Sequence, residues 1–240
     1  MASKSPPEII KIGLGVFFGI IVVLLVVLYL NTLSRSEQDI YINNDEEPII
    51  LPSPGTKGEL SLEEAIVARR SVRVFRPDEL DYAQVSQLLW AAQGITDEAT
   101  GHRAAPSAGA TYPLELYYID SKGVYRYNPS ENLLEPLKSG DYRSDLASAA
   151  LGQNFISQAP AAIVISAVYE RTTSGYGRAR GERYVHIEAG HAAQNIHLQA
   201  VSLGLGSVPV GAFNDNQVKR VLSLPENNEP IYIIPVGMPN

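Results

Sequence analysis

The sequence contains no cysteine, and only two methionines and one tryptophan occur among its 240 residues. A chain without cysteine has no disulfide framework, no thiolate zinc site, no cysteine-ligated iron–sulfur cluster and no cysteine nucleophile. The absence of cysteine suits both oxidising and reducing compartments, so it does not locate the protein.

Basic residues are outnumbered, with 19 Lys and Arg against 26 Asp and Glu, which gives a net charge of −7. This acidic balance disfavours nucleic acid as a partner. The G-x-G-x-x-G fingerprint, the P-loop, the HExxH zinc motif and the G-x-S-x-G nucleophile elbow are all missing. The remaining composition is that of a globular protein, with 45% hydrophobic residues, 19 Gly and 16 Pro, and it excludes a collagen, a coiled coil and a wholly disordered chain.

One apolar run stands near the N-terminus, after a short flank at residues 1–11. Residues 12–30 carry no charge, and as a helix they would extend about 28 Å, close to the thickness of a bilayer core. The run is apolar on every face, which disfavours a buried soluble helix. No small-residue cleavage site follows Leu30, which disfavours a cleaved signal peptide. The sequence therefore predicts a single-pass membrane anchor.

The charges that flank this run predict its orientation. Lys4 and Lys11 precede it, and Arg35 is the one basic residue that follows it closely. By the positive-inside rule the N-terminus is cytoplasmic and the body of the chain is extracytoplasmic. Residues 31–56 are polar and acidic and predict a stalk in which only residues 49–52 dock, and residues 57–240 form the folded domain.

The folded domain mixes helix and strand signals without a regular βαβ rhythm, so we expect an α+β fold. Capping boxes at Ser61–Glu64 and Asp81–Gln84 predict two helix starts, and Gly94 ends the second helix. Periodicity predicts further helices at 142–155, 182–203 and 215–222, and strands at 114–119, 124–127, 161–168 and 231–236.

The first chemical motif is a cationic cluster where the first of these helices ends. Arg69, Arg70, Ser71 and Arg73 lie within five residues. Guanidinium forks match phosphate oxygens, and a hydroxyl adds a neutral donor. The alternative interpretation is a solvated basic patch that the helix C-terminus favours.

Two loops rich in small residues form the second and third motifs. Residues 103–113 and 204–213 combine Gly, Ala and Pro, so their backbone can approach a flat ligand closely. The alternative for each is an ordinary connecting loop.

The fourth motif lies on the long helix predicted at 182–203. Glu188 and His191 are three residues apart and share a face. A metal site of this type needs a second copy of the motif, which the sequence lacks, so we expect no metal site and interpret His191 as part of a core or polar network.

Seven segments in order resemble the flavin-dependent nitroreductase superfamily and, within it, the SagB/ThcOx-type dehydrogenases. The resemblance extends over about residues 51–239 and is carried by RRSVRVF at 69–75, LLWAAQGI at 88–95, PSAGATYPLELY at 106–117, ALGQ at 150–153, RYVHIEAGHAAQN at 183–195, GLGSVPVGAF at 204–213 and PVGMP at 235–239. It implies a nitroreductase-like FMN-binding fold, with a central mostly antiparallel sheet flanked by helices, in a homodimer that holds FMN between its subunits.

The resemblance also implies roles for particular residues. The cationic cluster would hold the FMN phosphate, ribityl chain and part of the ring, a loop of the partner subunit would lie against the isoalloxazine, and a third segment would run beside the ring with backbone N–H groups toward N5 and O4. These residues are Arg69, Arg70, Ser71 and Arg73 for the first, Pro106, Ser107, Ala108 and Gly109 for the second, and Pro209, Val210 and Gly211 for the third.

Three positions depart from the family pattern. Ala110 replaces an Asn common in nitroreductases, no basic residue stands near the C-terminus, and Gly175-Tyr176-Gly177 replaces a Lys-Tyr-Gly stretch of azoline oxidases. Tyr176 is therefore the candidate catalytic residue without its lysine neighbour.

These observations predict a membrane-anchored, FMN-dependent oxidoreductase that passes a hydride through flavin N5 to or from a small molecule, with NAD(P)H as a candidate donor. The alternatives are an azoline-to-azole dehydrogenase acting on a modified peptide, a flavin-binding module without turnover, and a scaffold without a cofactor.

Overall fold

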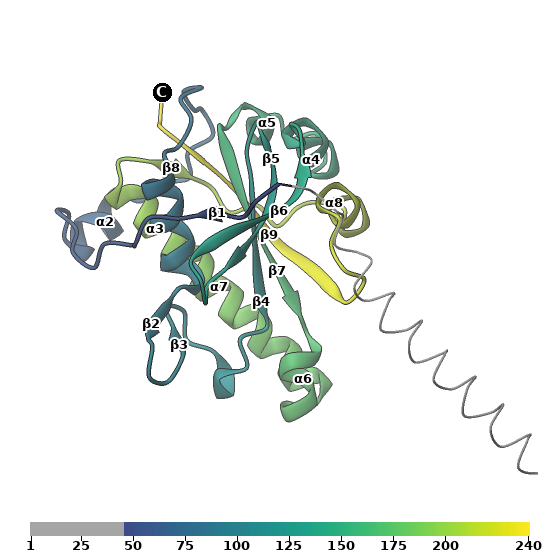
Figure 1. The fold of residues 1–240 in the computed structure, drawn as a ribbon. Helices are drawn as coiled ribbons and strands as arrows, with labels where there is room; N and C mark the ends of the chain where they lie inside the picture. The colour runs from purple at the N-terminus through teal and green to yellow at the C-terminus, as the bar shows by residue number, and fades with distance from the viewer. Residues whose placement is uncertain (1–45) are drawn as a thin grey trace, which may run out of the picture. The chain divides into compact units, whose positions relative to one another are not determined.

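A seven-stranded antiparallel sheet forms the centre of the computed structural model, which describes residues 46–240 (Figure 1). The strand order is β1-β6-β5-β4-β7-β9-β8, and each neighbouring pair is antiparallel. The strands are β1 (Ile49–Ile50), β4 (Leu114–Ile119), β5 (Gly123–Asn128), β6 (Leu133–Ser139), β7 (Ala161–Val168), β8 (Gly206–Ser207) and β9 (Asn228–Gly237). This arrangement confirms the predicted α+β class with an antiparallel central sheet.

Helices cover both faces of this sheet. One face packs against α3 (Tyr82–Gln93) and α7 (Arg178–Ser202), and the other against α4 (Arg143–Ala149), α5 (Phe155–Gln158) and α8 (Asp215–Leu222). Strand β4 serves both cores, because Leu116 and Tyr118 point to the first face while Tyr117 and Ile119 point to the second. The shorter elements are α2 (Leu62–Ala68), α6 (Glu170–Tyr176), a 3₁₀ turn at Ala108–Ala110 and the hairpin of β2 (Ile95–Asp97) and β3 (His102–Arg103).

Both predicted capping boxes are present. Ser61 and Asp81 accept the backbone N–H of Glu64 and Gln84, whose side chains accept the cap N–H groups in return. Helix α3 ends at Gly94 as predicted, and a Cβ at this position would lie 2.1 Å from the Trp90 ring. The glycine is thus required by close packing.

The predicted helix at 142–155 is wrong as a single helix. Helix α4 ends at Ala149, and the chain then turns through two residues with positive φ, Leu151 at 60° and Gly152 at 75°, before α5 begins. Left-handed residues cannot continue an α-helix, so this pair divides the segment. Strand β6 was not predicted at all, and it contains Pro136, a residue that usually argues against a strand.

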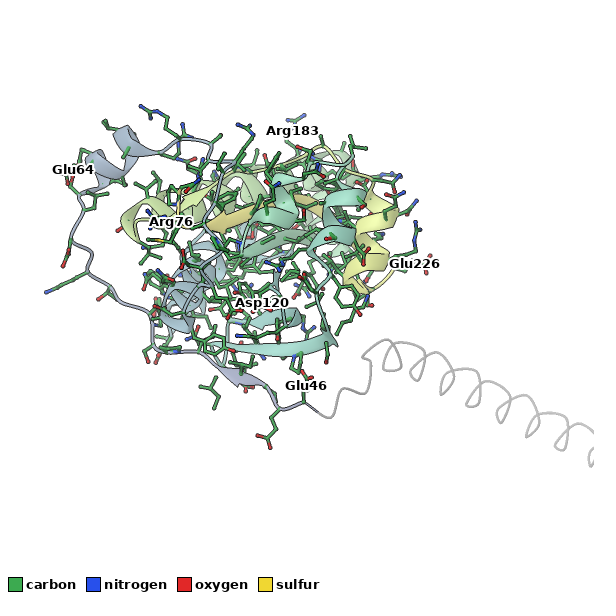
Figure 2. All side chains as sticks on the ribbon, turned by 90° about the horizontal axis from the view of Figure 1, so that it is seen from above. Glu46, Glu64, Arg76, Asp120, Arg183 and Glu226 are labelled. Atoms are coloured by element: carbon green, nitrogen blue, oxygen red, sulfur yellow. The ribbon has the colours of Figure 1, made fainter. Side chains whose placement is uncertain are left out.

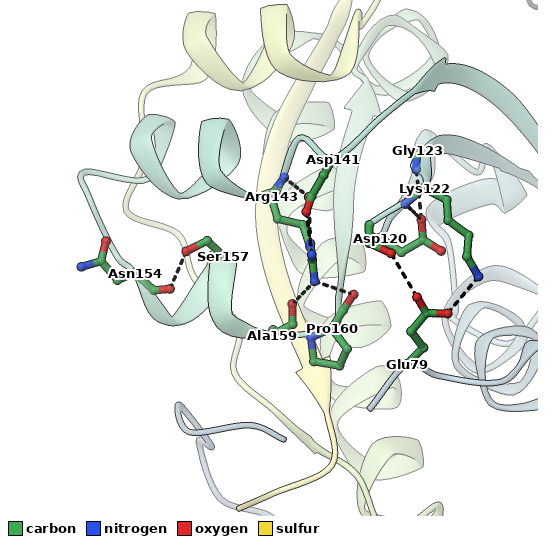
Figure 3. Close-up of polar contacts among 11 residues, drawn as sticks. Glu79, Asp120, Lys122, Gly123, Asp141, Arg143, Asn154, Ser157, Ala159 and Pro160 are labelled. Atoms are coloured by element: carbon green, nitrogen blue, oxygen red, sulfur yellow. Dashed lines mark hydrogen bonds and ion pairs between the residues drawn. The ribbon is translucent and has the colours of Figure 1, made fainter. Parts of the chain in front are cut away.

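Arg143 fastens the start of α4 to the residues that lead into β7 (Figure 3). Its guanidinium lies 2.6 Å from Asp141 and donates hydrogen bonds to the carbonyl oxygens of Ala159 and Pro160. The Arg143 hydrogen bond lowers the pKa of Asp141 below its usual value. A charged pair therefore fixes how α4 lies on the sheet.

The predicted docking of residues 49–52 is confirmed, but the expectation that nothing else in the stalk docks is wrong, because Glu46 accepts a hydrogen bond from Ser139 and the Gly55 N–H donates to Gln87. Ile49 and Ile50 pair with Leu134 and Leu133 of β6, and Leu51 is buried. The domain boundary at residue 57 and the stalk at 31–56 stay predictions from composition. The flank 1–11 and the anchor 12–30 lie outside the described residues. Among residues 46–240, no helix has the length and apolar character needed to cross a membrane.

The cationic cluster is attached to the edge of the sheet. Ser71 forms a parallel bridge with Ser207 of β8, and the Val72 N–H donates to the Ser207 carbonyl at 3.1 Å. Gly206 allows this approach, because a Cβ there would lie 2.6 to 2.7 Å from three carbon atoms of the Val72 side chain. The segment that follows α2 is therefore positioned by contact with β8.

Replacing Gly206 with alanine should destabilise the fold by about 1–3 kcal/mol, the usual cost of overpacking a close contact. Val72 is β-branched and cannot swing aside easily. Urea denaturation measures the change. Gly175→Ala is the control, because its added Cβ meets no atom within 4 Å, and we expect equal or slightly greater stability for it. Equal stability of Gly206→Ala and the natural protein would contradict the proposed contact.

Candidate functional site

Arg69 contacts a buried histidine that the sequence pattern did not single out. Its Nη1 lies 3.0 Å from Nε2 of His197 on α7, and His197 Nδ1 lies 2.6 Å from the Ser207 hydroxyl. His197 is only 3% exposed. These two hydrogen bonds connect the cationic cluster, helix α7 and strand β8. We call the three residues the Arg69–His197–Ser207 unit.

The partners of His197 determine its protonation. Because a guanidinium only donates, Nε2 must accept from Arg69, so Nδ1 carries the proton and donates to Ser207. Burial, and then the charge of Arg69, lower the pKa of His197 to about 4. The imidazole is therefore neutral at pH 7 and orients Arg69 without repelling its guanidinium.

The other cluster residues differ in exposure and contacts. Ser71 and Arg73 are exposed, and the Arg73 guanidinium lies 5.7 Å from the centre of the Phe155 ring. Arg70 instead donates to the carbonyl oxygens of Val67 and Arg69, both at 2.7 Å. Arg70 thus satisfies carbonyls at the C-terminus of α2, as the basic-patch alternative expects, whereas Ser71 and Arg73 face solvent.

Two residues predicted from different motifs, Gly109 and Tyr176, lie against each other. A Cβ on Gly109 would lie 2.6 Å from the Tyr176 hydroxyl, and the Tyr176 ring packs edge-on against Tyr184 of α7. Gly109 has φ of 63°, and Ala110 and Tyr112 have φ of 51° and 43°. Left-handed non-glycine residues are uncommon, and such strain is concentrated at functional sites.

A buried carboxyl lies beneath the same loop. Glu188 of α7 is 2% exposed, Gln93 Nε2 is 3.5 Å from its Oε1, and the Ser107 hydroxyl also bonds to it. Ser107 accepts the backbone N–H of Tyr112 at 3.0 Å. Burial raises the pKa of Glu188 to about 7, against the opposing effects of the Ser107 and Gln93 hydrogen bonds and the Arg103 charge.

The interpretation of His191 as a core histidine is wrong. His191 is exposed, while the buried stripe of α7 contains Glu188 and His197 in its place. The i, i+3, i+4 spacing of the apolar residues Val185, Ala189 and Ile196 was the signal that could have found both. Among residues 46–240 no cluster of three metal-ligating side chains occurs.

Part of the Pro209–Gly211 backbone is hydrogen-bonded to the central sheet. The Val210 N–H donates to the Ile233 carbonyl at 2.8 Å and the Val210 carbonyl accepts in return, while proline has no N–H. Among the described residues, nothing accepts the N–H of Gly211. Gly211 also lines an open cavity of about 750 Å³ that Tyr169, His186 and Phe213 border.

The cationic cluster and the small-residue loop contact α7 at separate points. Arg69 meets α7 at His197, Ser107 meets it at Glu188, and Tyr176 meets it at Tyr184. At ~1.5 Å per residue these points lie about 14 Å and about 20 Å from His197 along the helix. The loop and the cluster therefore contact different turns of α7.

Comparison with known proteins assigns the family. The model of the nitroreductase family matches residues 66–238. The nitroreductase-type protein MJ1384 of Methanocaldococcus jannaschii is 46% identical over 185 residues, which are 75% of this chain and 91% of that protein. The chain belongs to the nitroreductase family. A nitroreductase-type structure from Ralstonia eutropha aligns with a TM-score of 0.74 and 33% identity, over 83% of this chain and 92% of that chain.

A more distant relative bears on the predicted subgroup. The microcin B17-processing protein McbC of Escherichia coli is 27% identical over 61% of this chain, which spans 58% of that protein. The predicted membership in the SagB-type subgroup is therefore supported only by relatives of low sequence identity. Members of the nitroreductase family generally bind FMN and are commonly homodimers.

Glu188→Gln should remove a pH dependence of stability. Because the folded-state pKa of Glu188 lies above its unfolded value of 4.5, its stabilising contribution is full below pH 4.5 and is lost as pH rises through 7. Between pH 5 and 8 the natural protein should therefore lose up to about 3 kcal/mol that the variant retains.

Urea denaturation of both proteins at the two pH values makes this measurement. Glu226→Gln is the matched control, since Glu226 is exposed at the periphery of the molecule (Figure 2). Parallel pH profiles for the natural protein and Glu188→Gln would show that Glu188 does not titrate in this range.

Proposed function

We propose that this nitroreductase-family chain is an FMN-dependent oxidoreductase whose substrate is a small molecule. The observation that carries the proposal is the Arg69–His197–Ser207 unit, which holds a guanidinium beside the exposed Ser71 and Arg73. When bound, FMN supplies hydride transfer at its N5 atom.

The cluster suits a phosphate group. Arg69 gives one N–H contact to His197 and retains other donors of its five, and Arg73 and the Ser71 hydroxyl add to them. Because its pKa is lowered to about 4, His197 adds no positive charge of its own at neutral pH. We infer that Arg69 and Arg73 together balance the phosphate charge.

The small-residue loop and Gly211 suit the flavin ring. Pro106 and Gly109 are exposed, and their lack of long side chains allows the backbone to approach a flat ring. The Gly211 N–H is the amide of the Pro209–Gly211 segment that can donate to a ring atom, because Val210 is engaged in the sheet. Developing negative charge on the ring is stabilised by such a donor.

A second copy of the chain would complete the site. Members of the nitroreductase family are commonly homodimers, and we infer that a loop from a partner subunit supplies the wall opposite the cluster. Exposed apolar side chains also favour association with a second copy. Ile66 and Val67 on α2 are 53% and 71% exposed, and Ile187 on α7 is 48% exposed.

We propose further that residues 12–30 anchor the chain in a membrane, with the folded body extracytoplasmic. The uncharged run and the positions of Lys4, Lys11 and Arg35 support this. Fractionation of cells expressing the full chain tests it, and recovery in the supernatant after lysis would contradict it.

FMN binding should depend on Arg69 through the phosphate. Arg69→Gln should weaken FMN binding about 10- to 150-fold, which corresponds to ~1.5–3 kcal/mol for a lost charged hydrogen bond. His197→Leu should act in the same direction, because Arg69 then loses the acceptor that orients it. Riboflavin, which has no phosphate, should bind all three proteins alike. Quenching of flavin fluorescence by the apoprotein gives each affinity.

The control for this titration is Arg220→Gln, because Arg220 is exposed on α8. Heat release and chromatography of the bound flavin should identify FMN rather than FAD. Natural affinity for FMN in Arg69→Gln would show that the cluster is only a surface patch.

Azoline oxidation is the second candidate function, favoured by the likeness to McbC and by the contact of Tyr176 with Gly109. That reaction requires a base for the ring proton. Gly175 offers no side chain, and the phenol of Tyr176 alone is a poor base for this step. We therefore expect fast flavin reduction by NADH or NADPH and slow loss of two hydrogens from an azoline peptide.

Stopped-flow absorbance and peptide mass measurement make the comparison. Tyr176→Phe should slow turnover with a small change in stability, since the phenyl ring keeps its packing against Tyr184. Rapid azoline turnover without any nicotinamide reaction would reverse the assignment.

A further inference from the structure

A polar pocket of about 330 Å³ lies where β4 begins and β5 ends, apart from the Arg69 unit. Three guanidinium groups line it, from Arg103, Arg126 and Arg171, and one carboxylate, from Glu115. Asn128 and Ser130 add polar groups to the wall. Such an excess of cationic donors over acceptors is typical of anion sites rather than of apolar ligand pockets.

Arg103 is the cation in this pocket whose charge is least compensated. It is partly buried, and its Nη1 donates to the neutral amide oxygen of Gln93 at 3.1 Å while the guanidinium lies 4.7 Å from the centre of the Tyr112 ring. Among residues 46–240 it has no carboxylate oxygen within 4.0 Å. Burial lowers the pKa of Arg103, and the positive charge of Arg171 adds to this effect, against the opposing charges of Glu115 and Glu188. Buried charges normally have a counter-ion.

The acidic residues nearby do not supply that counter-ion directly. Glu115 is paired with Arg171 at 2.6 Å, and Glu135 is paired with Arg126 at 2.6 Å. Glu188 is linked to Arg103 by hydrogen bonds through Gln93, and the two groups also interact through their charges. Because burial raises the pKa of Glu188 to about 7, that group is only partly ionised at neutral pH.

We propose that this pocket binds a small oxyanion, a phosphate or a carboxylate, with Arg103 as its principal donor and Arg171 as a second. The guanidinium fork of Arg103 matches two oxygens of such a group, and the volume is near the lower end for small-molecule sites. The site differs from the cluster proposed for the FMN phosphate, because Arg103 and Arg69 belong to separate segments and contact different partners. Its existence does not depend on flavin binding.

The test uses the full chain, saturated with FMN where FMN binds, so that the Arg69 cluster is occupied. Inorganic phosphate and citrate are titrated in separate calorimetric experiments, with sodium chloride at the same ionic strength as the control for screening. The two arms distinguish a phosphate site from a carboxylate site. We expect saturable binding of at least one of the two anions and no saturable response to chloride.

Arg103→Gln should weaken this binding about tenfold or more, whereas the exposed Arg220→Gln should leave it unchanged. Arg171→Gln is the second variant if Arg103→Gln does not fold, because Arg171 is exposed and its removal should weaken binding several-fold. Equal binding by the natural protein and both pocket variants would overturn the proposal. The absence of saturable binding to the natural protein would also overturn it.

Discussion

A stripe of buried residues along α7 holds that helix on the central sheet, and the candidate functional groups are positioned by it. Ala189, Ala193, Ile196 and Ala200 are buried in the core that α7 shares with α3 and one face of the sheet, and three of these four side chains are small. Close packing leaves a helix little freedom to shift. The contacts that α7 makes with Arg69, Ser107 and Tyr176 are therefore fixed relative to the sheet.

Two members of this buried stripe are polar, and that is costly unless each is satisfied. Burying an unpaired polar group costs about 1–3 kcal/mol, and more for a charge. His197 is neutral and makes hydrogen bonds with Arg69 and Ser207. Glu188 has a raised pKa and accepts hydrogen bonds from Ser107 and Gln93. Apolar residues would stabilise the core more simply, so the presence of both groups points to a role at the site.

Features that depend on neighbouring residues could be predicted from the sequence, whereas strand pairing between distant segments could not. The boxes at Ser61 and Asp81 and the docking of Ile49 were predicted because each depends on near neighbours or on simple burial. Strand β6 was missed because Pro136 disfavours a strand in the sequence, whereas pairing with β5 and β1 stabilises one in the fold. His191 was preferred over His197 because a shared face with Glu188 was weighed without the apolar stripe, which decides which side of α7 is buried.

The geometry of α7 also bears on the proposal that two chains form each flavin site. A helix is a rigid spacer of fixed rise, so the contacts of Tyr176 and Arg69 with α7 stay about 20 Å apart along its axis. Under the proposal, one copy supplies the cluster of one flavin site and the loop of the other. Under this proposal, association of two copies would create two sites at once, because a two-fold interface places each half of one chain beside the other half of its partner.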